Sequence, residues 1–173
     1  YAMADGQGAD APAFLGNGRF EGRRLRLRAV KFLADGALGS RGAALHAPYS
    51  DEPAQSGLLM LTAEQLQQQA KAFADKGFQV AVHAIGDRAN TVAIDVLSEL
   101  EKGRPGSRHR VEHLQVLRPE DVPRLAADLE GGKGAGAPAG RPAIEVADHV
   151  IVERQWPQPR ASLVRPQAVL THP

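Results

Sequence analysis

The stretch GFQVAVHAIGDRAN, residues 77–90, decides the fold that this sequence predicts. Its centre, residues 78–86, is a short and almost continuous apolar run, which is typical of a parallel strand covered on both faces. From about Asp87 onward, apolar residues recur at helical spacing as far as Gly103, which is expected to end that helix. The stretch therefore predicts a buried strand followed at once by a helix.

Upstream of this stretch, LRLRAVKFL, residues 25–33, predicts another strand. Its basic residues alternate with apolar ones, which is the pattern of a strand with one face in water. The small residues of 35–44 can only form a loop, and the proline-containing segment 45–61 extends that loop. A long insertion is therefore expected between the first two strands of the organised region.

Helix signals connect the predicted strands to one another. Thr62 and Gln65 form a capping-box pattern, and the apolar stripe that follows ends at Gly77. HRVEHLQVL, residues 109–117, predicts a third strand, and Pro119 suits the first position of a short helix after it. This alternation of strand and helix is the order of an α/β protein with parallel strands and right-handed crossovers.

The two ends of the chain differ from its central region, which covers residues 23–127. Residues 1–22 are rich in glycine, alanine and aspartate and are expected to form a loop-like lead-in. Residues 128–173 contain few large apolar side chains; the segment 143–153 has strand-like composition, but no helix pattern follows it. A divergent extension, a flexible linker and an out-of-frame translation all stay open for this tail.

The composition is that of a soluble globular protein, with 43% hydrophobic and 24% charged residues. A net charge of +1 leads us to expect neither nucleic acid nor a membrane surface as a partner. No apolar run reaches the roughly 20 residues of a membrane span. The chain has no cysteine, which excludes disulfides and thiolate metal sites. We expect a cytoplasmic protein; the oligomeric state stays open, and so does a natural N-terminus upstream of Tyr1.

Three residues near the carboxyl ends of the predicted strands are candidate metal ligands: Lys31, His83 and His113. Barrel enzymes place their sites at these ends, and the two histidines lie 30 residues apart, which fits one repeat of a (β/α) barrel. Neutral imidazole is the commonest metal ligand in proteins. The alternative for His83 is a buried structural histidine, and His109 is a rival to His113 at the start of the same strand.

Lys31 precedes His83 by 52 residues, which is why the long insertion is needed. Charged lysines in strands are normally exposed, but the apolar neighbours Val30 and Phe32 leave neither face of this strand plainly polar. A lysine that points into a crowded interior needs a lowered pKa or a chemical modification. A carbamate formed on its amine would be a carboxylate able to bridge two divalent ions.

Four charged residues after the strand ends are candidates for orienting substrate or ligands: Asp35, Arg41, Asp87 and Arg88. The alternative is that they cap helices and pin loops. The glycines within residues 36–42 match neither a dinucleotide fingerprint nor a phosphate-binding loop, and the sequence has no G-x-S-x-G elbow.

Three motifs resemble the amidohydrolase family 3 group, which includes N-substituted formamide deformylase-like proteins. They are VKFLADGALGSRGAAL (30–45), GFQVAVHAIGDRAN (77–90) and RHRVEHLQVLRPEDV (108–122), in the right order over roughly residues 25–127. The resemblance implies a metal-dependent hydrolase with a (β/α)8 TIM-type barrel that acts on amide-type, non-peptide C–N bonds of small molecules. This chain would supply part of such a barrel, about strands 4 to 6 with their helices.

The resemblance also implies roles for individual residues. The lysine of the first motif is expected to be carboxylated, which falls on Lys31, and the histidine ligands of the other two motifs fall on His83 and His113. The cofactor would be a divalent metal, usually zinc, as one or two ions. The family's H-x-H pair and its S-D-x-P aspartate, the expected general base, have no counterpart in this sequence, so we expect an internal fragment.

Two other functions stay open beside a fragment of an amide hydrolase. One is an inactive truncated product, whose open partial barrel would expose sheet edges. The other is a small α/β binding module in which the histidines are structural.

Overall fold

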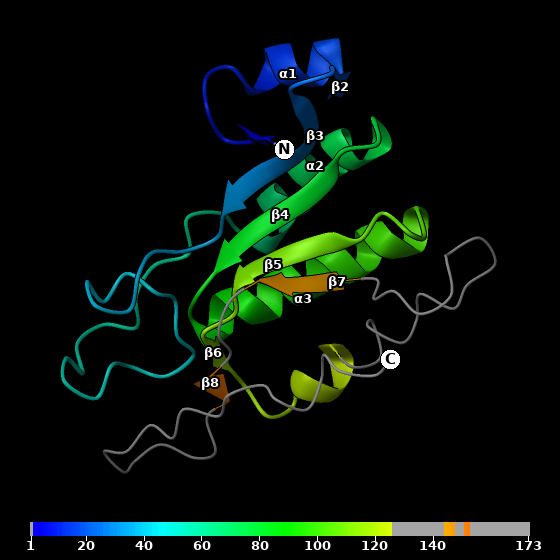
Figure 1. Cartoon of the computed structure of the whole chain (residues 1–173). Helices are drawn as coiled ribbons and strands as arrows, with labels where there is room; N and C mark the ends of the chain where they lie inside the picture. Colours follow the sequence, from blue (N-terminus) through cyan, green and yellow to red (C-terminus); the bar gives the residue numbers. More distant parts are fainter. Residues whose placement is uncertain (1, 126–143, 148–150, 153–173) are drawn as a thin grey trace.

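The computed structural model describes residues 2–125, 144–147 and 151–152 of the 173-residue chain. Helices and strands alternate along most of this length (Figure 1). In chain order, the elements are β1 (Ala2–Asp5), α1 (Ala11–Asn17), β2 (Phe20–Glu21), β3 (Arg26–Leu33), α2 (Ala63–Asp75), β4 (Gln79–Ala84), α3 (Asp87–Gly103), β5 (His109–His113), β6 (Val116–Leu117), β7 (Ile144–Ala147) and β8 (Ile151–Val152).

A parallel sheet organises the molecule, with its main strands in the order β1-β3-β4-β5-β7. The short strand β2 adds to β3 in the antiparallel direction, and β6 and β8 form a separate parallel pair. The helices α2 and α3 pack on one face of the sheet (Figure 1). The mixed α/β architecture with parallel strands that the sequence predicts is confirmed.

The helix α2 begins as its sequence predicts. The Thr62 hydroxyl accepts a hydrogen bond from the backbone of Gln65, and the Gln65 side chain accepts one from the backbone of Thr62, which completes the capping box. The buried stripe of α2 includes Phe73, whose ring lies between Phe32 and Phe78 at centroid distances of 6.1 and 5.5 Å, both edge-on. These rings fasten the helix to β3 and to the start of β4.

The two faces of the sheet carry different side chains. Alternate residues of the central strands point into the core beneath α2 and α3: Val30, Phe32, Val80, Val82 and Val111. The residues between them point to the other face, on which polar and ionisable groups are found: Lys31, His83, Arg110 and Glu112. The chemistry predicted for this chain therefore belongs to the face opposite the helices.

Residues 2–21 correct the prediction of a loop-like lead-in, because β1, α1 and β2 lie there. The strand β1 runs parallel to β3, with Asp5 in register with Lys31. Ala4 is the residue of β1 that is buried, so this strand has no pattern of large apolar residues by which it could be recognised. Backbone pairing with β3 defines it instead.

The predicted third strand, residues 109–117, is interrupted in its middle. His113 and Leu114 have φ angles of 77° and 46°, which an extended strand does not allow, and the segment divides into β5 and β6. After Pro119 the backbone makes a turn and becomes helical at residues 122–125.

The tail contributes to the sheet where its composition predicts a strand. Within residues 143–153, β7 pairs with β5 and β8 pairs with β6. The rest of the predicted tail, residues 128–173, lies outside the described residues. No helix in the described ranges is long and apolar enough to cross a membrane.

Candidate metal centre

His83 and His113 meet at the carboxyl edge of the sheet. His83 is the penultimate residue of β4, and His113 is the last residue of the neighbouring strand β5. Their ring centroids are 4.7 Å apart, with the ring planes at 73°. Two of the three predicted ligands are therefore neighbours in space.

The positive φ of His113 brings about this meeting. Strict alternation along β5 would place His113 on the core face, together with His109 and Val111. The φ of 77° departs from strand geometry, and the ring of His113 lies against His83 on the opposite face. A positive φ is uncommon for a residue other than glycine, and such strain concentrates at functional sites.

The surroundings of His83 favour its neutral form. Burial lowers the pKa of His83, and the nearby His113 and Lys31 lower it further, while the carboxylate of Asp35 acts in the opposite direction. Nε2 of His83 is buried and has no hydrogen bond in the described part of the chain. It lies 3.6 Å from Oδ1 of Asp35. A neutral imidazole is the form that binds a metal ion.

Asp35 holds the strand ends together from inside the protein. Its carboxylate accepts hydrogen bonds from the backbone N–H groups of Ala44 (2.9 Å), Ile85 (3.0 Å) and Gly86 (2.8 Å). Burial raises the pKa of Asp35, although these three donors lower it. With its side chain buried and occupied by backbone donors, Asp35 pins the loop after β3 to the end of β4.

The same loop is tied to the beginning of α3. The carbonyl of Ala44 accepts hydrogen bonds from the backbone of Arg88 (3.1 Å) and Ala89 (3.4 Å). A Cβ on Gly86 would lie 2.0 Å from this carbonyl oxygen, so only glycine permits the approach. The loop after β3, the end of β4 and the first turn of α3 are thus joined by hydrogen bonds, and together they form the support beneath His83.

The remaining orienting candidates lie in or beside this support. Asp87 accepts a hydrogen bond from the backbone of His46 at 2.9 Å, and the side chain of Arg88 is exposed. Arg41 forms an ion pair with Asp51 at 2.9 Å within the long loop. Asp35, Arg41 and Asp87 therefore all make contacts that hold loops in place, which is the structural role that the sequence analysis gave as the alternative to orienting substrate.

Lys31 lies on the same sheet face as His83, one pleat earlier. It is in register with Ala81 of β4, two residues before His83, and with Asp5 of β1 on its other side. Lys31 is half-buried, and its charge contributes to the lowered pKa of His83. All three predicted ligands therefore share one face and one edge of the sheet.

The donor set fits a metal ion, although it needs a third ligand. Two imidazoles held at one edge, one with its pKa lowered, are donors that suit zinc and similar divalent ions. Among the described residues, no three histidine, cysteine, aspartate or glutamate side chains gather closely enough to hold an ion. An unmodified lysine is not an anionic ligand, so Lys31 could complete the set only as a carbamate.

Glu112 is an acidic neighbour of this site that sequence analysis did not select. It is in register with His83 on the adjacent strand and is only 8% exposed. Arg110 donates to it from Nε at 2.8 Å and from Nη2 at 3.3 Å. The signal in the sequence was a charged pair, Arg110 and Glu112, alternating with His109, Val111 and His113 within one strand.

The comparisons with known proteins agree with the motifs. The model of the amidohydrolase family matches residues 2–163, so this chain belongs to the amidohydrolase family. The match begins before and ends after the span of 25–127 that the motifs covered. It therefore includes β1, α1 and β2 at one end, and β7 and β8 at the other.

Individual relatives come from bacteria, plants and archaea. The protein YtcJ of Bacillus subtilis (strain 168) is 40% identical over 110 residues, which are 62% of this chain and 20% of YtcJ. Protein LONG AFTER FAR-RED 3 of Arabidopsis thaliana is 38% identical over 103 residues, 58% of this chain and 18% of that protein.

A solved structure has a similar fold over two thirds of this chain. The crystal structure of an uncharacterized metal-dependent hydrolase from Pyrococcus furiosus is 38% identical with a TM-score of 0.59, covering 66% of this chain and 25% of that one. The chain thus spans about a fifth of its curated relatives and a quarter of this structure.

Proposed function

We propose that this chain is part of a metal-dependent hydrolase with a (β/α)8 barrel that cleaves amide-type, non-peptide C–N bonds in small molecules. The observation that carries the proposal is the contact between His83 and His113 at the carboxyl edge of a parallel sheet. This edge is where barrel enzymes place their active sites. Membership of the amidohydrolase family and the name of the Pyrococcus furiosus structure support a metal-dependent hydrolase.

The proposed ligands are His83, His113 and Lys31 as a carboxylated lysine, and they would hold one or two divalent ions, with zinc as the expected metal. A bound zinc ion would supply Lewis-acid polarisation of the amide carbonyl and activation of water. The residues of the chain prepare the site for it. Burial and the nearby His113 lower the pKa of His83, which favours the neutral imidazole that binds a metal ion.

Metal binding by the full chain tests this assignment. We expect the chain, prepared with zinc and bicarbonate, to retain zinc in stoichiometric amount, and His83→Ala or Lys31→Ala to lose it. His46→Ala is the matched control, because His46 is an exposed histidine of the long loop, and it should retain zinc. Circular dichroism of each variant shows whether loss of metal reflects loss of fold.

The carbamate can be detected separately. With 13C-bicarbonate, the unsubstituted chain should show a carbamate carbon signal that depends on zinc and is absent in Lys31→Arg. A folded chain that binds no zinc would contradict the metal site and favour a binding module with structural histidines. Zinc binding that survives Lys31→Ala would show that the third ligand lies elsewhere.

A further inference from the structure

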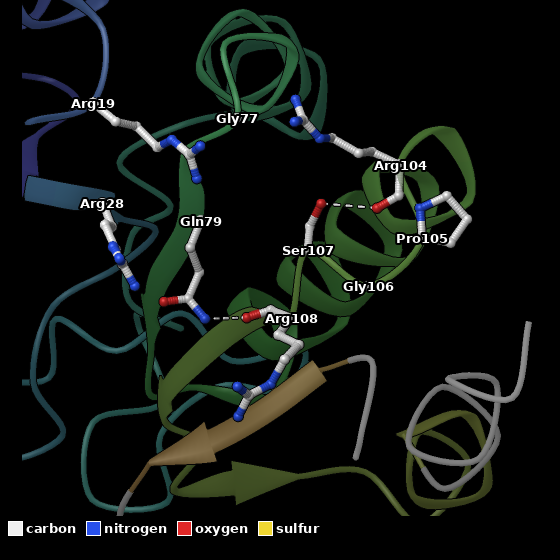
Figure 2. A pocket seen from close by; sticks show the side chains of 9 residues that line it. All are labelled: Arg19, Arg28, Gly77, Gln79, Arg104, Pro105, Gly106, Ser107 and Arg108. Carbon is white, nitrogen blue, oxygen red and sulfur yellow. Dashed lines mark hydrogen bonds between the residues drawn. The ribbon is translucent and has the colours of Figure 1, made fainter. Parts of the chain in front are cut away.

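A polar cavity lies at the edge of the sheet opposite His83 and His113 (Figure 2). It has a volume of about 360 Å³, and its lining comes from the starts of strands and the ends of helices: Arg19, Arg28, Gly77, Gln79, Arg104, Pro105, Gly106, Ser107 and Arg108. Gln79 begins β4, and His83 lies four residues further along this strand, or ~13 Å at the rise of a β-strand. The cavity is therefore separate from the candidate metal centre.

The lining of this cavity is strongly basic. Of the nine described residues that line it, four are arginines and none is acidic. Glu21, which is not part of the lining, forms an ion pair with Arg28 and accepts a hydrogen bond of 2.7 Å from its terminal nitrogen. The charged residues among the described lining are all basic, and this composition favours an anionic ligand.

Arg104 is held in place at the mouth of the cavity. Its terminal nitrogen donates to the carbonyls of Ala74 (3.1 Å) and Asp75 (3.4 Å) at the end of α2. Gly77 has a φ of 84°, and a Cβ there would lie 3.2 Å from the other terminal nitrogen of Arg104. Gly77 thus allows both the left-handed turn and the close approach of the Arg104 guanidinium.

The loop after α3 completes the wall. The Ser107 hydroxyl donates to the carbonyl of Arg104 at 2.8 Å, and the side chain of Gln79 donates to the carbonyl of Arg108 (Figure 2). In Figure 2, the side chains of Arg19 and Arg104 extend toward the opening from opposite sides. A guanidinium fixed before a ligand arrives loses little conformational freedom on binding.

We propose that this cavity binds a small phosphate-bearing anion. Guanidinium groups bind phosphate oxygens through paired N–H donors, and several of them around one space suit a dianion with three acceptor oxygens better than a planar carboxylate. The volume is in the range of pockets for small ligands. This site goes beyond the proposed hydrolase function and depends on neither the metal nor its ligands.

Titration of the full chain with inorganic phosphate, at an ionic strength held constant with chloride, tests the proposal by calorimetry. We expect saturable binding that weakens ~10-fold in Arg104→Gln, which removes a charge-assisted donor pair. Because Arg104 also fastens α2, Arg19→Gln is the second variant. Arg19 is exposed in the connection before β2, and its replacement should weaken binding several-fold without loss of fold.

Two controls separate a defined site from general attraction. Arg23→Gln removes the same charge from a nearby exposed loop outside the lining and should bind phosphate as the unsubstituted chain does. His83→Ala should also bind phosphate unchanged, so failure of the metal proposal is distinguishable from failure of this one.

Three results would overturn the phosphate site. They are no saturable binding by the folded chain, an equal loss of affinity in Arg23→Gln and Arg19→Gln, or binding of succinate as tight as that of phosphate. The first two would leave no defined anion site. The third would assign the cavity to carboxylates instead.

Discussion

The substitution His109→Asn should make the stability of the chain less sensitive to acid. His109 is fully buried at the start of β5, and its Nδ1 accepts a hydrogen bond from the backbone of Val80 at 3.0 Å. The proton of the neutral ring is therefore on Nε2, a buried atom without a hydrogen bond in the described residues. Burial, followed by the charge of Arg104, lowers the pKa of His109 from 6.5 to about 4.

The magnitude follows from this lowered pKa. The unfolded chain takes up a proton at His109 near pH 6.5, whereas the folded chain does so only near pH 4. The free energy of unfolding therefore falls as pH decreases through this window. The loss amounts to about 3 kcal/mol, at about 1.4 kcal/mol for each pH unit between the two pKa values. Asparagine can accept the Val80 hydrogen bond and does not titrate, so its variant should not show this component.

Urea unfolding followed by circular dichroism, at several pH values between about 7 and about 4, measures the effect. Val111→Ala is the matched control, because it also opens space on the core face of β5 but removes no titrating group. Its stability should fall with pH in parallel with that of the unsubstituted chain. If the curve of His109→Asn runs parallel as well, burial of a neutral histidine is not what makes the fold acid-sensitive.

Two further substitutions test the support beneath the candidate metal centre. Gly86→Ala should destabilise the chain by ~3 kcal/mol in urea unfolding, because its Cβ would lie 2.0 Å from the carbonyl oxygen of Ala44. Gly103→Ala is the control: Gly103 has open space around it at the end of α3, so this substitution should be neutral or stabilising. A similar effect of both would contradict the steric argument. Asp35→Ala should lower the free energy of unfolding by at least ~3 kcal/mol in the same measurement, because three buried N–H groups lose their acceptor. A decrease of less than ~1 kcal/mol would show that water replaces the carboxylate as their acceptor.

The central elements could be predicted from the sequence because local signals and burial agree there. The capping box at Thr62 and the apolar run before His83 indicate α2 and β4 without knowledge of the rest of the fold. The edge strands could not be predicted in this way. Neither β1, with Ala4 as its buried residue, nor the short β8 contains enough large apolar side chains, and pairing with a neighbour defines both.

The proximity of His83 and His113 could be expected from the sequence, but the geometry of their meeting could not. Spacing and motif resemblance selected His83 and His113, but they did not predict that a positive φ at His113 would bring the two rings together. The positive φ of His113 is a property of the folded backbone, and no pattern of side chains in the sequence predicts it. Asp35 was found as an acidic residue near a strand end, but its three backbone donors lie 9, 50 and 51 residues away, beyond any local pattern.

The reach of Asp35 has a consequence for the order of folding. Its bonds to Ile85 and Gly86 close a loop of about fifty residues, and a contact of that separation forms only after the intervening chain has lost much of its freedom. The pairing of β3 with β4 closes a loop of the same length, because Ala29 is in register with Gln79. The surroundings of His83 should therefore form together with this pairing and after the local helix α2. On the proposed function, zinc uptake should therefore report the pairing of β3 with β4 and not the formation of α2.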